Sequence, residues 1–145
     1  MEIDFFASRW GSSSQLESIR LRENVLRRPL GLTFSTEELM EERDQHHLIA
    51  QIKKHVVGIL ILSPLNRNEI KMRQVAIHPS YQNKGIGSQL VLFAEEYAMN
   101  LCFPKITLHA RKTAFNFYQK LKYQTNKKPF LEVGIPHYLM WKILI

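Results

Sequence analysis

Hydrophobic and polar positions follow two periods along this chain. Residues 56–62 form an almost unbroken apolar run rich in β-formers, which predicts a central strand. Other β-rich stretches at residues 47–53, 69–78 and 105–110 predict further strands. A long amphipathic helix is predicted over residues 86–101, where apolar residues recur every three or four positions. Its apolar positions are Ile86, Leu90, Phe93, Ala94, Tyr97, Ala98 and Leu101.

The N-terminal region predicts one strand and two helices. Residues 3–8 form the strand, and the spacing of Ser14 and Glu17 is that of a capping box opening a helix over residues 14–27. Pro29 ends this helix because proline lacks the amide proton. A second capping box begins a short helix that runs to residue 43. The first helix is expected to bury Leu16, Ile19, Val25 and Leu26, and the second box is formed by Ser35 and Glu38.

The C-terminal region predicts a helix over residues 113–122 and two closing strands, 130–133 and 138–144. The complete order is β-α-α-β-β-β-α-β-α-β-β. This order predicts an α/β fold with a mixed sheet rather than a doubly wound parallel one. We expect residues 1–145 to form a single domain.

Two glycines mark the start of the long helix. Gly85 and Gly87 follow Pro79 and a polar turn, and the first amides of a helix lack partners at the positive end of its dipole. Such a site suits a phosphate or pyrophosphate, to which Lys84 would add a positive charge. The third glycine of a dinucleotide-binding fingerprint is absent, since Leu90 occupies its place. A P-loop is absent too, because the lysine precedes the glycine.

The segment from Gln82 to Gly87 resembles the Gln/Arg-x-x-Gly-x-Gly/Ala signature of the GNAT N-acetyltransferase superfamily. The segment from Ala114 to Tyr123 is similar to the Ala-x-x-Phe-Tyr-x-x-Leu-Gly-Phe helix of the same enzymes, with Lys122 in place of glycine. The order of elements matches along essentially the whole chain. The resemblance implies a GNAT-like, mostly antiparallel mixed sheet with flanking helices. It also implies acetyl transfer from acetyl-CoA to a primary amine, by direct attack in a ternary complex.

The resemblance further implies which residues bind coenzyme A. The main chain at Val75 and Ile77 would pair with the pantetheine arm, and Asn116 would hydrogen-bond to it. The amides of one loop would hold the pyrophosphate. This loop comprises Gln82, Asn83, Lys84, Gly85, Ile86, Gly87 and Ser88.

Catalytic roles follow less directly. Tyr118 matches the family tyrosine that protonates the leaving thiolate. The glutamate that many relatives use as a base would fall on Lys71, so the base is left open among His109, His137, Glu69 and a water relay.

Two arginines are candidates for the acceptor site. Arg73 and Arg111 either flank it, which would suit an acidic or amino-acid-like amine, or form ion pairs on the sheet surface.

Composition limits the remaining alternatives. The chain has 145 residues and a net charge of +7, but its basic residues are scattered and no nucleic-acid signature accompanies them. A basic surface also suits polyanionic coenzyme A. No apolar run reaches the roughly 18 residues that span a membrane, and the start does not resemble a signal peptide, so we expect a cytoplasmic protein.

The expected partners follow from this picture. They are acetyl-CoA and a small-molecule or peptide amine, without a metal, a membrane or nucleic acid, and a homodimer is compatible with the resemblance. Two other functions remain open at this stage: a non-catalytic acyl-CoA-binding module on the same fold, and a basic nucleic-acid-binding domain.

Overall fold

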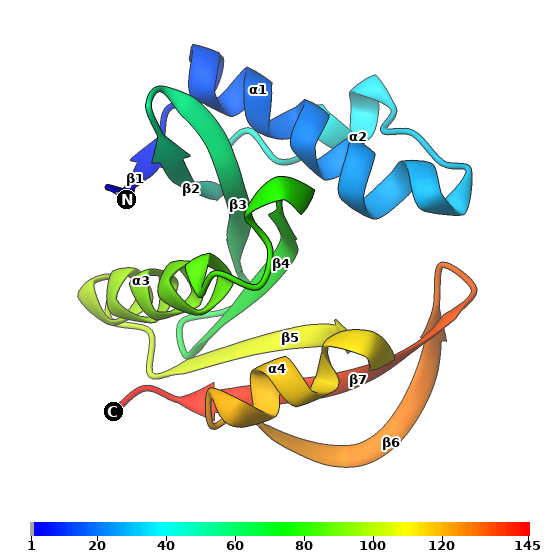
Figure 1. Cartoon of the computed structure of the whole chain (residues 1–145). Coiled ribbons are helices and arrows are strands. Elements are labelled where there is room, and N and C mark those ends of the chain that lie inside the picture. Colours follow the sequence, from blue (N-terminus) through cyan, green and yellow to red (C-terminus); the bar gives the residue numbers. More distant parts are fainter. Residues whose placement is uncertain (1) are drawn as a thin grey trace.

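The computed structural model describes residues 2–145 and contains a seven-stranded sheet with helices on both faces (Figure 1). The strand order is β1-β2-β3-β4-β5-β7-β6, and among these neighbours only β4 and β5 run parallel. The predicted mixed, mostly antiparallel sheet is therefore confirmed. The strands are β1 (Asp4–Ser8), β2 (His46–Ile52), β3 (His55–Pro64), β4 (Glu69–Ile77), β5 (Lys105–Arg111), β6 (Gln124–Glu132) and β7 (Ile135–Ile143).

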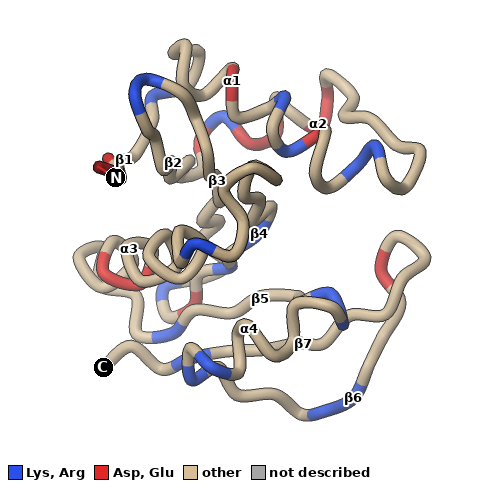
Figure 2. The backbone as a smooth tube through the Cα atoms, in the orientation of Figure 1, with Lys and Arg blue, Asp and Glu red and all other residues tan. Residues whose placement is uncertain are grey.

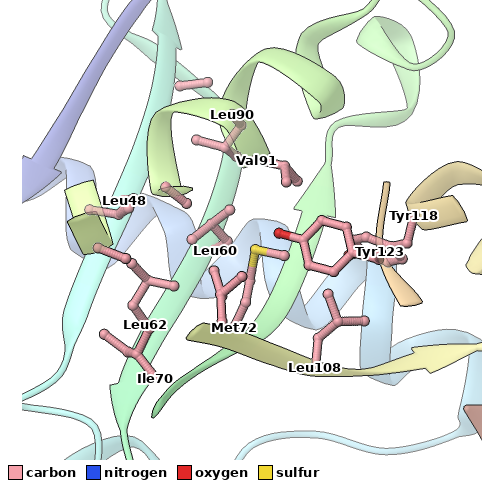
Figure 3. Packing of buried hydrophobic residues seen from close by; sticks show 14 of the residues in the cluster. Leu48, Leu60, Leu62, Ile70, Met72, Leu90, Val91, Leu108, Tyr118 and Tyr123 are labelled. Atoms are coloured by element: carbon pink, nitrogen blue, oxygen red, sulfur yellow. The ribbon is translucent and has the colours of Figure 1, made fainter. Parts of the chain in front are cut away.

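The two faces of the sheet carry different helices. Successive strand residues point to opposite faces, and α1 (Ser13–Arg22) covers the face that contains Ile49 and Ile59. The opposite face packs against α3 (Ile86–Asn100) and α4 (Phe115–Lys120), while α2 (Thr36–Met40) lies beside α1. Figure 3 shows Leu60, Met72 and Leu108 pointing toward one another in the core on the α3 side. None of the described helices is long and apolar enough to span a membrane.

The first helix differs from its prediction at both ends. Ser12, not Ser14, is its N-cap and accepts a bond from the amide of Gln15. Leu16 is 55% exposed, so its predicted burial was wrong. The side chains buried on α1 are Gln15, Ser18, Leu21 and Arg22. Three of the four are polar and form hydrogen bonds, which explains why an apolar periodicity pointed to the wrong face.

The helical path continues past α1 as a π-helical turn (Glu23–Arg27) and a 3-10 turn (Arg28–Leu30). Pro29 lies in the last of these, and Gly31 closes it in the left-handed region at φ 71°. This irregular segment matters for function because it carries Leu26 and Arg27 to the open end of the β4–β5 pair.

Strands β4 and β5 separate after a short paired stretch. Their register joins residues 69–72 to residues 105–108 and stops there. Gln74 then forms a β-bulge at φ 58°, between Arg73, which opposes Ile61, and Ala76, which opposes Ile59. The bulge shifts the alternation of β4, so that Met72 faces α3 but Ala76 faces α1. A gap therefore opens in the middle of the sheet.

The C-terminal hairpin is longer than predicted. Its turn is formed by Val133 and Gly134, and the next three residues already belong to β7. His137 is therefore a strand residue, whereas the sequence analysis had left it between the two closing strands. Pro136 is tolerated in β7 because it opposes Leu131 on the edge strand β6 but lies before the stretch that pairs with β5.

Candidate active site

A cleft of about 350 Å³ occupies the gap between β4 and β5. Side chains from both faces of the sheet reach it. Tyr118 and Ala114 come from the α4 side, whereas Arg27 comes from the π-helical turn beyond α1. The other residues on which the argument below depends are Lys71, Arg73, Val75, His109, Arg111, Glu132 and His137. The cleft thus connects the two faces where the sheet hydrogen bonds are missing.

The edge of β4 presents backbone groups to this cleft. The His78 amide donates to the Val57 carbonyl at 2.8 Å on the β3 side. Backbone groups of neighbouring strand residues point to opposite sides, so those of Val75 and Ile77 face the gap. The Ile77 carbonyl accepts a bond from the Gln82 side chain at 3.0 Å. The Val75 backbone has no β5 partner, because the β4–β5 register ends at Met72.

The loop between β4 and α3 exposes a run of backbone donors. Gln89 is the first helix residue whose amide is bonded, to the Gly85 carbonyl at 3.1 Å. Within residues 2–145, the six amides from Asn83 to Ser88 donate no hydrogen bond. Gly85 and Asn83 adopt positive φ of 80° and 61°, which shapes this turn. Free amides at a helix N-terminus fit the pyrophosphate of coenzyme A.

The two glycines of this loop serve different purposes. Gly85 is needed for its left-handed backbone. A Cβ at position 87 would lie in contact with the Phe117 ring, at 3.4 Å, so any longer side chain at this position extends beside α4. Asn116 is exposed on α4 and lies outside the cleft lining.

Tyr118 is the buried hydroxyl at the α4 side of the cleft. Only 6% of the residue is exposed, and its ring packs edge-on against Phe117 and Tyr123. Burial raises the pKa of the Tyr118 hydroxyl above its usual value, so it is protonated at neutral pH. Among residues 2–145 the hydroxyl makes no hydrogen bond, which leaves its proton available to a ligand.

His109 and His137 share one carboxylate on the opposite face of the sheet. His109 Nδ1 lies 2.9 Å from Glu132 Oε1, and His137 Nε2 lies 3.7 Å from Glu132 Oε2. Burial alone would raise the Glu132 pKa. The His109 bond and the charges of His109, His137 and Lys71 outweigh it and hold that pKa below its usual value. Glu132 stands at the end of β6, and only the β5–β7–β6 register brings it to His109.

The position expected for the family glutamate holds Lys71, which lines the cleft. Burial lowers the pKa of Lys71, Glu132 opposes this shift, and Arg73 adds to it. Glu69 lies at the closed end of the β4–β5 pair, 3.8 Å from Lys105, so the structure removes it from the candidate bases.

A buried ion network supports the α1 wall of the cleft. Arg22 is fully buried and donates to both oxygens of Glu42, at 2.9 and 2.8 Å. Arg73 also donates to Glu42, at 3.0 Å, and Arg22 contacts the side chain of Gln74 on the bulge. Burial lowers the pKa of Arg22, and the bonds with Glu42 oppose that shift. Arg73 therefore forms an ion pair, which is one of the two roles that the sequence analysis gave it.

Arg111 crosses the opening of the cleft. Its guanidinium donates to the Leu26 carbonyl at 3.0 Å and so links the end of β5 to the π-helical turn. Burial lowers the pKa of Arg111, Arg27 adds to this shift, and Glu132 opposes it.

Residues 13–123 match the model of the Acetyltransferase (GNAT) family, and this chain belongs to that family. The Bacillus subtilis protein YyaT is 38% identical over 72 residues, which are 50% of this chain and 49% of that protein. The match thus spans about half the length of this curated relative.

Solved structures share the fold. An acyl-CoA N-acyltransferase from Pseudomonas aeruginosa superposes with a TM-score of 0.81 at 20% identity, over 97% of this chain and 99% of that one. A GNAT family acetyltransferase from Elizabethkingia anophelis, crystallised with acetyl-CoA bound, superposes with a TM-score of 0.75 at 18% identity, over 97% of each chain. At these identities the similarity concerns the fold.

Proposed function

We propose that this protein is an N-acetyltransferase that moves the acetyl group of acetyl-CoA to a primary amine by direct attack in a ternary complex. The observation that carries this proposal is the cleft between β4 and β5. It combines unpaired backbone on one wall with Tyr118 and His109 on the two faces of the sheet. Acetyl-CoA supplies the acetyl group as an activated thioester. We expect the protein to act in the cytoplasm and as one domain.

The chain's backbone would hold the donor. The free amides from Asn83 to Ser88 match a pyrophosphate, and Lys84 adds a positive charge. The open backbone of Val75 would pair with the amides of the pantetheine arm, next to Ile77. Asn116 would need a different rotamer or a ligand that extends over α4 to take part, because its side chain is exposed outside the cleft.

His109 is the proposed base. An amine with a pKa of about 10.4 is only about 0.1% neutral near pH 7.4, so transfer needs a group that removes its proton. The bond to Glu132 places the His109 proton on Nδ1, which leaves Nε2 to accept the amine proton. His137 is 3% exposed and its Nδ1 donates to the Ile135 carbonyl at 2.9 Å, so we assign it a structural role rather than that of the base.

Tyr118 would donate a hydrogen bond to the sulfur as the thiolate leaves. Its raised pKa lies above that of a free thiol, about 8.5, so complete transfer of its proton to sulfur is uphill. The tyrosine therefore stabilises the developing charge, and any proton it gives is recovered from solvent.

The test is acetyl-CoA consumption across amino acids, polyamines, aminosugars and peptides. Tyr118→Phe should lower kcat about 10- to 100-fold, because it removes a hydrogen bond to a charged atom, with unchanged CoA affinity. His109→Gln should lower kcat/KM about 100-fold or more near neutral pH. Tyr138→Phe and His55→Gln, outside the cleft lining, serve as matched controls. Binding of CoA without turnover of any amine would instead favour a non-catalytic acyl-CoA-binding module.

A further inference from the structure

The charges in the cleft are unbalanced. Among the described residues that line it are four cationic side chains, Arg27, Lys71, Arg73 and Arg111, against one carboxylate, Glu132. Figure 2 shows basic positions on β4 and at the end of β5, with an acidic position near the β6–β7 turn. A substrate that enters this cleft therefore meets an excess of positive charge.

Two of these cations already have a carboxylate partner. Arg27 donates to Glu38 at 2.9 Å, and Arg73 donates at 3.0 Å to Glu42, a carboxylate that it shares with Arg22. Among residues 2–145, Lys71 and Arg111 have no carboxylate oxygen within 4.0 Å. Among the described residues, the Arg111 guanidinium bonds only the Leu26 carbonyl, through one of its nitrogens, so further donors of its planar fork are free.

The strand register places these free cations on the face that carries the proposed base. Lys71 opposes Thr107, and Thr107, His109 and Arg111 alternate along β5 on one face. Arg111 in turn opposes His137. His109 and Arg111 are thus two residues apart, about 7 Å along the strand. One small molecule can therefore place an amine at His109 and an anionic group at Arg111.

We propose that the acceptor amine also carries a carboxylate, which binds Arg111 with support from Lys71. This inference rests on the proposed function. A guanidinium fork matches a planar carboxylate, and the bond is charge-assisted in a partly buried site. Polyamines and other purely cationic amines are disfavoured by the same charges. The pyrophosphate-binding amides lie at the N-terminus of α3, so the free cations of the cleft are not needed for the donor.

The experiment compares matched acids and amides. The twenty common amino acids and their carboxamides are assayed for acetyl-CoA consumption, with spermidine as the cationic probe. N-acetylglycine and N-acetylglycinamide are titrated into the protein–CoA complex by calorimetry, which needs no turnover. The acids should exceed their amides by about 10- to 100-fold in kcat/KM and in affinity.

Arg111→Gln should reduce this ratio to near one and leave CoA affinity unchanged. Arg67→Gln removes the same charge from an exposed loop and should leave the ratio intact. Equal or better use of amides or spermidine overturns the carboxylate proposal while the acetyltransferase stands. Failure of every acid to bind overturns it as well, and so does a ratio that survives Arg111→Gln. Acids that bind through Arg111 without consumption of acetyl-CoA would instead overturn the acetyltransferase function alone.

Discussion

The two walls of the cleft are built from different materials. The wall formed by β4 offers backbone groups at its unpaired edge near Val75, and the free amides from Asn83 to Ser88 continue it at the start of α3, beyond the residues that line the cleft. The opposite wall offers side chains from separate elements, among them His109 on β5, Glu132 on β6 and Arg111 beside the π-helical turn. The first wall can bind a ligand through its backbone whatever its side chains are, as long as the turn before α3 is kept. The second depends on particular side chains.

The two walls therefore differ in how they respond to substitution of their side chains. A backbone site keeps its donors when side chains change, provided that the turn and the helix start are kept. A side-chain site changes its chemistry with each substitution. We call the first the donor wall and the second the acceptor wall, because under the proposed function the first would bind acetyl-CoA and the second would select the amine.

The largest expected effect concerns the support of the α1 wall. Glu42→Gln leaves the buried guanidinium of Arg22 without its carboxylate, and should lower the free energy of unfolding by about 3 kcal/mol or more. Urea unfolding measures this loss. Where the variant remains folded, CoA affinity should be unchanged, because the donor wall is backbone.

Glu38→Gln is the matched control. Glu38 pairs with Arg27, but 44% of its side chain is exposed, and glutamine can keep the capping box with Ser35. An exposed pair contributes up to about 1 kcal/mol. Equal losses in the two variants would show that burial of the Arg22–Glu42 pair has no special weight.

The donor wall is tested by Gly87→Glu compared with Gly87→Gln. Both side chains meet the Phe117 ring, so they share the steric cost. A glutamate at the first turn favours the helix itself, because it faces the positive end of the dipole. It should nevertheless bind CoA about 100-fold more weakly than the glutamine variant, since it repels the pyrophosphate. Calorimetry with CoA measures the difference, and equal affinities would place the pyrophosphate elsewhere.

The same contrast explains how much could be predicted. The order of the elements along the chain and the α3 start were predictable because they rest on local patterns: the apolar run of β3, the β-rich stretches before and after it, and the spacing around Gly85. The turn between β2 and β3 is formed by Lys53 and Lys54, which both adopt positive φ.

The acceptor wall was predictable only in part. His109 was a candidate on its own, but its partner Glu132 is 23 residues away, and their contact depends on β6 being the neighbour of β7. The Arg22–Glu42 pair was not predicted, because the pattern of apolar positions in a helix does not indicate that an arginine on it is buried. The bulge at Gln74 was not predicted, because glutamine is not a residue type that indicates positive φ.

The smallest expected effect concerns the charge on the acceptor wall. A carboxylate whose folded pKa lies below its unfolded value of about 4.3 stabilises the protein above that value, and the stabilisation is lost as the pH falls through the folded pKa. Glu132 is in this situation. The unfolding free energy of the wild type should therefore exceed that of Glu132→Gln at pH 5, and the difference should shrink toward pH 3.

The difference at pH 5 should stay below about 1 kcal/mol, because 43% of the Glu132 side chain is exposed and solvent screens its partners. Urea unfolding at several pH values measures it. A difference that grows toward pH 3 would mean that the folded protein favours the protonated carboxyl. In that case the bond with His109 would not stabilise the charged form of Glu132, and the orientation of His109 on which the proposed base depends would lose its support.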